Sequence, residues 1–444
     1  MNLRTCLVIG LLLGTHHIKA QVSFVPTNYP VGMSPVSVVA SEINADGKIN
    51  LICANSFSAP GTLSILTNDG SGLFSSGATL NVGNGPHSVI ATDINNDGKL
   101  DLISANYGGN TISILTNNGS GIYGSNATLN VGPLPDSLAA ADVNGDGKVD
   151  LVFALNNGLN GIAVFTNNGS GVFGSNAVYN AITFCSSIIA TDVNADKKVD
   201  LIALSDSRLL VMTNNGTGTF GSNTLLNASG GLTCFTAADI QGNGRLDLIA
   251  AVGSVPSKFY IWTNDGSGIF SSNTTFQVGK GVISVTTADV NGDGKVDLIA
   301  ASGNSIPRFI SVLTNDGSGI FSSNATIYVG TSPISLLAAD VNGDGKMDLI
   351  CANEGDNTVS VLINNTTFPP PTSTPSLNVN PTSNKLTVSW PSASAGWSLQ
   401  QSPNLSPTRW SPSGYGGYNI FDDGTNKSLT IPAAGNMFFR LLHP

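Results

Sequence analysis

A nine-residue segment of the form Asp-x-Asn-x-Asp-Gly-x-x-Asp recurs seven times along this chain of 444 residues. The copies begin at positions 42, 93, 142, 192, 239, 289 and 340, so neighbouring copies are 47 to 51 residues apart. A repeat of this length is typical of proteins that stack one supersecondary unit in a line or arrange it in a ring. The repeat therefore constrains the fold more than any other feature of the sequence.

Each unit has the pattern of four short β-strands. In the second unit, apolar or alternating segments at 101–106, 111–115 and 127–132 are separated by turns rich in Gly and Asn. Such alternation predicts strands, and no unit shows a helical period. The segment before each nine-residue loop is rich in small residues, as at 139–141, 237–238 and 338–339. We expect this segment to be the innermost strand, where space is smallest.

Seven four-stranded units predict a β-propeller, in which the sheets circle an axis and few strand edges stay open. The seventh unit lacks its fourth strand, because a Pro-rich stretch begins at residue 369. The segment Tyr-Pro-Val-Gly at 29–32 is similar to Tyr-Val-Gly at 328–330. We therefore expect the N-terminal strand to complete the last sheet and close the ring. A solenoid, the alternative, would need no such closure.

Four regions follow from these patterns. Residues 1–20 have the basic start, apolar middle and small final residue of a signal peptide, which predicts a secreted, extracellular or cell-surface protein, with the periplasm as an alternative. Residues 21–365 form the predicted propeller, 366–376 a Pro/Thr-rich linker, and 377–444 a small β-sandwich with strands near 385–390, 397–401, 428–431 and 437–442. The fold class is all-β. No transmembrane anchor is predicted. Core packing is the favoured role of Trp390, Trp397 and Trp410, and sugar stacking is the alternative.

The nine-residue loops contain 19 of the 28 acidic residues. Oxygen-bearing side chains at positions 1, 3, 5 and 9, with the carbonyl of position 7, match the ligands that Ca²⁺ prefers. Asx turns with solvated carboxylates are the alternative, but clustered carboxylates repel one another without a cation. The candidate calcium ligands are Glu42, Asn44, Asp46, Lys48, Asn50, Asp93, Asn95, Asp97, Lys99, Asp101, Asp142, Asn144, Asp146, Lys148, Asp150, Asp192, Asn194, Asp196, Lys198, Asp200, Asp239, Gln241, Asn243, Arg245, Asp247, Asp289, Asn291, Asp293, Lys295, Asp297, Asp340, Asn342, Asp344, Lys346 and Asp348.

The seven loops are not equal. An EF-hand would need Glu at the twelfth position and flanking helices, which these loops lack. Loops two, three, six and seven keep the full pattern. Loop one ends in Asn50, loop four has Lys197 where Gly is expected, and loop five has Gln241 and Asn243 at positions 3 and 5. We expect four good calcium sites, two doubtful ones and loop five as the weakest, with about four to seven ions in a structural role.

The unit V-G…P-x-S-V-x-x-x-D-x-N-x-D-G-K-x-D-L-I-x-A-N, clearest at 82–106 and 329–353, resembles the FG-GAP/VCBS repeat of integrin α-subunit propellers and of many secreted bacterial proteins. The resemblance extends from residue 23 to about 368. It implies a seven-bladed propeller with calcium loops on one face and ligand binding usually on the other. It names no ligand, because family members include adhesive, sugar-binding and enzyme-attached modules. Residues 377–444 resemble a small C-terminal module of secreted bacterial proteins.

The face opposite the loops is the predicted ligand face, because loops on a rigid scaffold commonly carry function. The aromatic residues Phe57 and Tyr107 lie in its connections, whereas Phe259 and Tyr260 fit a strand core better. An ordinary solvated surface is the alternative. The candidate ligand-binding residues are His87, Asp136, Arg208, Lys258, Lys280, Arg308, Glu354 and Asp356.

The sequence favours binding over catalysis. No nucleophile elbow, phosphate loop or dinucleotide fingerprint occurs, and the two histidines after the signal, His87 and His443, lie in different predicted domains. A net charge of −10 argues against nucleic acid. We expect an adhesion or ligand-binding module for extracellular polysaccharide or protein, not an enzyme. The alternatives are a protein-interaction scaffold and, less favoured, a polysaccharide lyase with Lys280 or Arg308 as the base.

The cysteines allow two interpretations. Cys53 and Cys351 occupy equivalent apolar strands and fit buried thiols. Cys185 and Cys234 begin the inner strands of adjacent units, where a disulfide and two free thiols both stay open.

Overall fold

The structure is a computed structural model that describes residues 21–57, 59–157, 161–179, 184–303, 306–367, 376–381, 385–391, 398–402, 411–412, 420–422, 426–432 and 438–442. The predicted signal peptide, most of the predicted linker, Trp397, Trp410 and His443 lie outside these residues. Every regular element within them is a β-strand. A search of the same residues finds no helix with the length and apolar character needed to cross a membrane.

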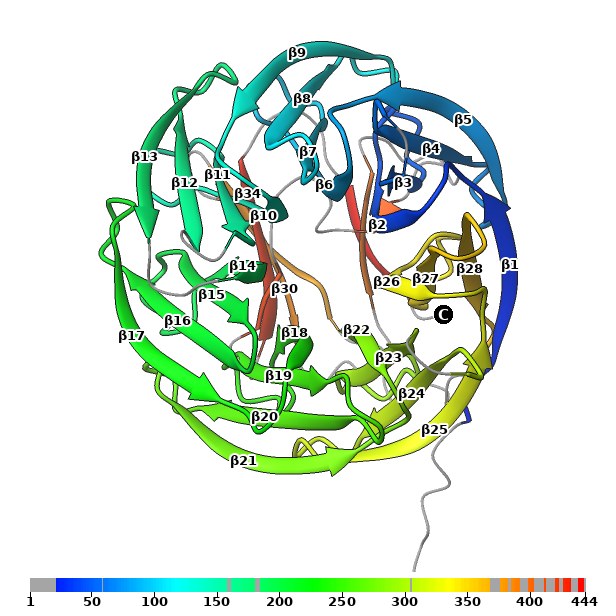
Figure 1. Cartoon of the computed structure of the whole chain (residues 1–444). Helices are drawn as coiled ribbons and strands as arrows, with labels where there is room; N and C mark the ends of the chain where they lie inside the picture. Colours follow the sequence, from blue (N-terminus) through cyan, green and yellow to red (C-terminus); the bar gives the residue numbers. More distant parts are fainter. Residues whose placement is uncertain are drawn as a thin grey trace, which may run out of the picture.

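Seven four-stranded antiparallel sheets, here called blades one to seven, form a ring between residues 24 and 364 of the described chain (Figure 1). The innermost strand of each blade is the segment rich in small residues, as expected. These strands are β2 (Pro35–Ser41), β6 (Pro86–Thr92), β10 (Pro135–Ala141), β14 (Cys185–Thr191), β18 (Leu232–Ala238), β22 (Val282–Ala288) and β26 (Pro333–Ala339).

The second strand of each blade is buried along its whole length, because neighbouring blades cover both of its faces. These strands are β3 (Asn50–Asn55), β7 (Asp101–Asn106), β11 (Asp150–Leu155), β15 (Asp200–Ser205), β19 (Asp247–Val252), β23 (Asp297–Ser302) and β27 (Asp348–Asn353). Such continuous apolar runs are typical of strands with both faces in a core.

The third strands are β4 (Thr62–Asn68), β8 (Thr111–Asn117), β12 (Ile162–Asn167), β16 (Arg208–Asn214), β20 (Lys258–Asn264), β24 (Phe309–Asn315) and β28 (Thr358–Asn364). The outer strands of blades one to six are β5 (Phe74–Asn81), β9 (Tyr123–Asn130), β13 (Phe173–Tyr179), β17 (Phe220–Asn227), β21 (Phe270–Gln277) and β25 (Phe321–Tyr328). Outer strands are largely exposed where their side chains are described.

The N-terminal strand β1 (Phe24–Pro30) is the outer strand of blade seven. It pairs antiparallel with β28, from Phe24 opposite Asn364 to Pro30 opposite Thr358. The predicted closure of the ring by the N-terminus is therefore confirmed. Thr366, at the start of the predicted linker, is buried and accepts a hydrogen bond from the backbone N–H of Ser23 at 3.0 Å.

The hydrophobic core is divided among the joints between blades. In the joint between blades one and two, Ile52 and Leu63 pack with Val89 and Leu102. The joint that closes the ring packs residues of β3 against Ile350 and neighbours of blade seven. Each blade therefore needs both neighbours to bury its faces, which favours a closed ring over an open stack.

The four described cysteines are free thiols, so Cys185 and Cys234 are not bridged in this structure. Cys53 and Cys351 are buried in joints as expected, and burial raises the pKa of both thiols above the usual range.

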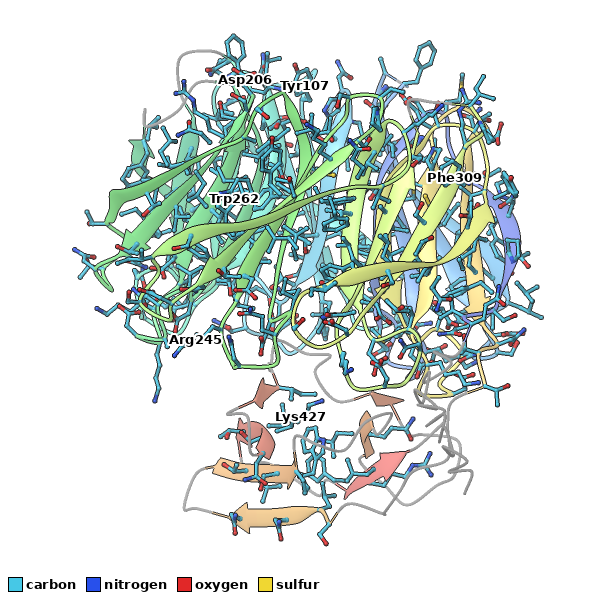
Figure 2. The ribbon with its side chains drawn as sticks, turned by 90° about the horizontal axis from the view of Figure 1, so that it is seen from below. Tyr107, Asp206, Arg245, Trp262, Phe309 and Lys427 are labelled. Carbon is cyan, nitrogen blue, oxygen red and sulfur yellow. The ribbon has the colours of Figure 1, made fainter. Side chains whose placement is uncertain are left out.

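The ring has two distinct faces. The nine-residue loops join first to second strands and lie on the same face as the hairpins between third and fourth strands; we call this the loop face. The connections from second to third strands and between successive blades lie on the opposite face, here called the upper face. Figure 2 shows Arg245, from loop five, on one side and Tyr107 and Asp206 on the other.

Two further sheets lie between residues 378 and 442. One contains β29 (Asn378–Pro381), β30 (Lys385–Pro391), β34 (Asn426–Pro432) and β33 (Phe421–Asp422), and the other contains β32 (Ser411–Pro412), β31 (Ser398–Ser402) and β35 (Phe438–Leu442). Trp390 is buried among Val388, Leu399 and Leu429. The core-packing role expected for Trp390 is confirmed.

Candidate functional site

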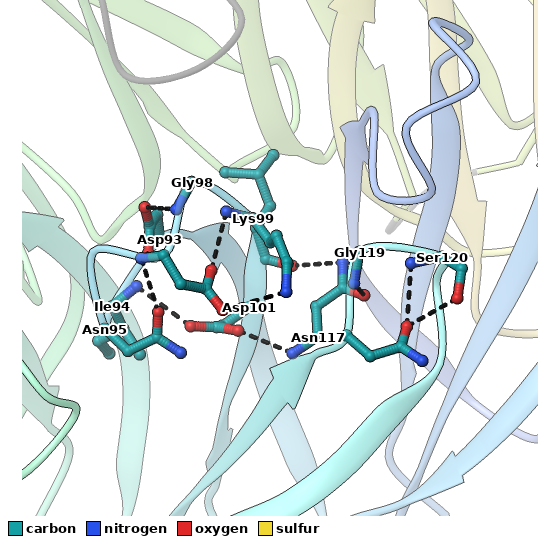
Figure 3. A network of polar contacts seen from close by, with 12 residues as sticks. Asp93, Ile94, Asn95, Gly98, Lys99, Asp101, Asn117, Gly119 and Ser120 are labelled. Atoms are coloured by element: carbon teal, nitrogen blue, oxygen red, sulfur yellow. Dashed lines mark hydrogen bonds and ion pairs between the residues drawn. The ribbon is translucent and has the colours of Figure 1, made fainter.

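The side chains of each nine-residue loop turn inward onto the loop's own backbone. In loop two, Asp93 accepts hydrogen bonds from the backbone N–H groups of Asp97 at 3.1 Å and Gly98 at 2.7 Å (Figure 3). Asn95 accepts a second bond from the N–H of Asp97 at 2.9 Å. Loop three has the same pattern around Asp142. The side-chain oxygens at positions 1 and 3 are thus held on one backbone N–H, that of position 5.

The ninth residue of each loop has a different position. Asp101 is fully buried, and its two oxygens accept hydrogen bonds from the backbone N–H groups of Ile94 at 3.2 Å and Asn117 at 2.8 Å. Loops three, four, six and seven repeat this arrangement with Asp150, Asp200, Asp297 and Asp348. The sequence predicts these residues only as calcium ligands, whereas the structure also makes them anchors of the loop's base.

A ring of seven buried asparagines, which the repeat pattern alone does not predict, links successive loops. Asn117, at the end of the third strand of blade two, donates through Nδ2 to the carbonyl of Ile43 in loop one at 2.7 Å and to that of Leu100 in loop two at 3.0 Å. The equivalent residues, which all make such a pair of bonds, are Asn68, Asn167, Asn214, Asn264, Asn315 and Asn364. The signal was present, because each third strand ends in Asn.

The chemistry of the loop oxygens tests how well each loop fits Ca²⁺. Loops two, three, four, six and seven present carboxylate oxygens at positions 1, 5 and 9, which can only accept. In loop one, Asn50 Nδ2 donates to the oxygen of Asn44 at 3.2 Å. In loop five, Asn243 Nδ2 donates to the oxygen of Gln241 at 3.1 Å. These two loops satisfy their own oxygens without a cation, so their donor sets fit calcium least.

Loop four keeps the loop conformation in spite of its lysine. The backbone of Lys197 has φ +66°, in the left-handed region where Gly98 and Gly147 lie in their loops. Its N–H donates to Asp192 at 2.7 Å, as the glycine N–H does elsewhere. A non-glycine residue in this region is strained. The substitution therefore costs stability but does not rearrange the site.

Several loop carboxylates are buried close to other carboxylates. Burial, aided by neighbouring carboxylates, raises the pKa of Asp297 and Asp348 to about 7 and that of Asp340 to about 6. In the described part of the chain, no group of three or more His, Cys, Asp or Glu side chains is arranged to hold a metal ion. Calcium binding by these loops therefore stays a prediction, carried by the oxygen-only donor sets of loops two, three, six and seven.

These pKa values predict how the calcium-free protein responds to pH. Asp297 and Asp348 titrate near 4 when unfolded and near 7 when folded, so the stability they contribute is complete below pH 4 and is lost as the pH rises through 7. In metal-free buffer we expect the midpoint of thermal unfolding to fall by several degrees from pH 5 to pH 8. Asp348→Asn should flatten this trend, and a midpoint that rises over this range would contradict it.

On the upper face, the structure brings two predicted residues into contact. His87 Nδ1 lies 2.9 Å from Asp136 Oδ1, and the other oxygen of Asp136 accepts from Asn156 Nδ2 at 2.9 Å. The ring of Tyr107 stacks on His87 at 4.2 Å with an interplanar angle of 8°. The side chains of His87 and Asp136 are 33% and 19% exposed. Because a carboxylate only accepts, Nδ1 of His87 donates, and Nε2 is left for a ligand.

Both residues lie at the same place in neighbouring inner strands, β6 and β10, where the pairing with the second strand shifts. This shift occurs at the equivalent position of every blade, and the residue within it is Val36, His87, Asp136, Ser186, Thr233, Ile283 or Ile334. Asn156 was not predicted, because nothing in its local sequence marks it.

Among the other predicted ligand residues, the two acids accept hydrogen bonds from neighbouring residues, and most of the basic residues are exposed. Glu354 accepts from the hydroxyl of Ser34 at 3.0 Å, and Asp356 accepts from the backbone N–H and hydroxyl of Thr331. Arg208, Lys258 and Lys280 are exposed, and Arg308 is half-buried. Glu354 and Arg308 form no ion pair in the described part of the chain. Phe259 and Tyr260 are buried as expected, and Phe57 is exposed.

The model of the FG-GAP-like repeat matches six overlapping segments of the chain, at 43–104, 93–153, 142–203, 192–250, 242–300 and 289–351. A comparison with curated proteins finds no match.

Solved structures are similar at low identity. One is BBS1N in complex with ARL6DN, with 14% identity, a TM-score of 0.54, and coverage of 78% of this chain and 98% of that one. A candidate 6-phosphogluconolactonase from Bacteroides uniformis has 15% identity, a TM-score of 0.53, and coverage of 68% and 87%. An Agrocybe aegerita lectin that recognises non-reducing terminal N-acetylglucosamine has 21% identity, a TM-score of 0.49, and coverage of 66% and 80%.

Proposed function

The chain belongs to the FG-GAP-like repeat family of β-propellers, and from that premise we propose that it is a secreted, calcium-stabilised module that binds extracellular polysaccharide or protein through its upper face. The family match and the all-β ring support a ligand-binding scaffold. Secretion rests on the signal-peptide pattern of residues 1–20. Calcium rests on the oxygen donors of the full-pattern loops.

One observation carries the choice of face. The loop face repeats one hydrogen-bonded pattern from blade to blade, so its polar side chains are occupied in holding the ring. The upper face varies among the blades: the seven residues at the inner-strand shift are of six types, and only Ile283 and Ile334 share one. Repetition on one face and variation on the other is the arrangement expected when a rigid scaffold presents a binding surface.

The cluster of His87, Tyr107, Asp136 and Asn156 is the proposed centre of this surface. It combines an imidazole held by Asp136, an aromatic ring and an amide within neighbouring blades two and three. A small number of polar groups that converge beside an aromatic ring suits a ligand rich in hydroxyl groups, such as a polysaccharide. A protein partner is the second candidate, favoured by the exposed apolar side chains of Phe57 and Met33 on the same face.

A polysaccharide array with residues 21–444 in calcium tests this function. We expect at least one polysaccharide to bind, and we expect His87→Ala to weaken that binding about tenfold, because it removes the oriented imidazole and the stacking partner of Tyr107. Asn118→Ala, on the loop face, should bind like the parent. Unchanged binding by a folded His87→Ala variant would place the ligand elsewhere. Failure of every polysaccharide to bind would favour a protein partner, to be sought by pull-down from the native surroundings.

A further inference from the structure

The upper face contains an isolated set of basic side chains. Outside the nine-residue loops, residues 21–365 contain four basic residues, and all four belong to the upper face of blades four, five and six. Arg208 begins β16, Lys258 begins β20, Arg308 precedes β24, and Lys280 lies between blades five and six. We call these four residues the basic sector. A local excess of positive charge is notable on a chain whose net charge is −10.

Four of the eight basic residues in the nine-residue loops pair with a neighbouring aspartate. Lys99, Lys148, Lys198 and Lys346 lie 3.5–3.9 Å from the aspartate two residues earlier in their loops. Arg208, Lys258 and Arg308, in contrast, form no ion pair with any residue that the structure describes. The Nε atom of Arg308 is buried and has no hydrogen-bond partner. The exposed side chains of Arg208 and Lys258 therefore present unpaired positive charge to a ligand.

The acids that the structure describes on the upper face form no ion pair with Arg208, Lys258 or Arg308. Asp136 is bound to His87 and Asn156, Glu354 to Ser34, and Asp356 to Thr331. Among described residues, Asp206 is the one acid within blades four to six on this face, in the turn between β15 and β16. It forms no ion pair with Arg208. The sector therefore keeps a net positive charge.

Other blades have a different residue at the positions of Arg208 and Lys258. In blades one, two and seven the third strand begins with Thr62, Thr111 or Thr358. Each threonine hydroxyl accepts from the amide of a buried asparagine that ends the second strand, at 3.0–3.1 Å. In blades four and five the same two places hold Ser205 with Arg208, and Val252 with Lys258. These two blades have no asparagine–threonine pair at this place and carry an exposed cation there instead.

Exposed apolar side chains accompany the cations. Phe184, Val255 and Ile306 lie in upper connections of the same three blades and are 50%, 63% and 82% exposed. Cations beside apolar groups suit a ligand that combines anionic groups with apolar faces. Acidic pyranose rings, with a carboxylate or sulfate on the ring and C–H groups on its faces, have this character.

We propose that the basic sector binds an anionic polysaccharide that carries carboxylate or sulfate groups at regular intervals. The inference rests on the proposed function and specifies its ligand class. Arg208 and Lys258 occupy equivalent positions in blades four and five, so the rotation from one blade to the next places a cation at the same position of each. A ligand whose charge also repeats along its length matches this spacing better than an acidic peptide, whose charges follow no fixed period.

The test compares charged polymers with matched neutral ones. Residues 21–444 are measured in calcium against dextran and dextran sulfate, and against polygalacturonate and its methyl ester. We expect the charged member of at least one pair to bind about tenfold more tightly, with affinity falling as salt rises. The two pairs distinguish sulfate from carboxylate. Poly-L-glutamate serves as the acidic polypeptide.

The double variant Arg208→Thr/Lys258→Thr carries the residue that other blades have at this place, so we expect it to fold. It should lose about tenfold in affinity for the charged polymer. The double variant Lys197→Gln/Lys427→Gln removes the same charge elsewhere and should bind like the parent. Equal losses in both would show a general charge effect and overturn the proposal. Tighter binding of poly-L-glutamate than of either anionic polysaccharide would overturn it too.

The two proposals fail separately. If a neutral polysaccharide binds and only His87→Ala weakens it, the proposed function stands and the basic sector is not its ligand site. If no polysaccharide of either kind binds, the basic-sector proposal fails and the proposed function is left with a protein partner. If the charged polymer binds and both His87→Ala and Arg208→Thr/Lys258→Thr weaken it, one ligand spans the cluster and the sector.

Discussion

Calcium removal is expected to lower the midpoint of thermal unfolding of the propeller by about 8 °C. With dissociation constants near ~10⁻⁴ M and about 1 mM calcium, each full-pattern loop contributes roughly 1.4 kcal/mol. Four such loops sum to about 6 kcal/mol, and a propeller of this size unfolds with an entropy near ~0.7 kcal/mol/K. The physical cause is the loss of a cation among buried, mutually repelling carboxylates. Thermal unfolding with 1 mM calcium and then with excess chelator measures the shift.

Two single variants locate the effect within the ring. Asp146→Ala, in full-pattern loop three, should reduce the calcium-dependent part of the stability by about 1.4 kcal/mol. Asn243→Ala, at the same position of loop five, should leave that part unchanged, because its amide already satisfies Gln241. Identical unfolding midpoints in calcium and chelator would contradict a stabilising role for the metal. A larger calcium effect in loop five than in loop three would contradict the ranking of the loops.

The ring and its closure were predictable because they depend on features that repeat along the sequence. Alternating strands, Gly/Asn turns and a missing fourth strand in the last unit are each visible in a short window. The predicted separation of the two faces also holds, because it requires only the order of strands and loops. His87 and Asp136 were expected on the same face for this reason.

The contacts between units were not predictable from local pattern. The backbone N–H of Asn117 donates to the side chain of Asp101, which is 16 residues away in the sequence. Its side-chain amide donates to the carbonyl of Ile43, which is 74 residues away. The pairing of His87 with Asp136 spans 49 residues and depends on how two inner strands approach at the axis. Likewise, the sequence places Arg208 and Lys258 on one face but does not show whether an acid neutralises them. Such facts depend on side-chain packing between blades.

The ring of buried asparagines predicts that the adjacent residues Asn117 and Asn118 contribute very differently to stability. Asn117 is buried, and its amide group donates to two backbone carbonyls while its oxygen accepts from the N–H groups of Gly119 and Gly121. Asn118 is exposed, and its oxygen caps a turn at Ser120. Hairpins of other blades have Asp69, Asp265 or Asp316 at the second position, but all six hairpins have Asn at the first, and β28 of blade seven also ends in Asn.

Asn117→Asp should therefore cost about 4 kcal/mol or more in the free energy of unfolding, whereas Asn118→Asp should change it by less than about 0.5 kcal/mol. A carboxylate at position 117 cannot donate to the carbonyls of Ile43 and Leu100, and it adds a buried charge close to Asp101. The two variants have the same composition and net charge. A difference between their free energies of unfolding in urea therefore reports the effect of the substituted position alone. Equal effects would mean that the asparagine ring does not hold adjacent blades together. A large loss of unfolding free energy in Asn117→Asp alone would show that the asparagine ring on the loop face holds adjacent blades together.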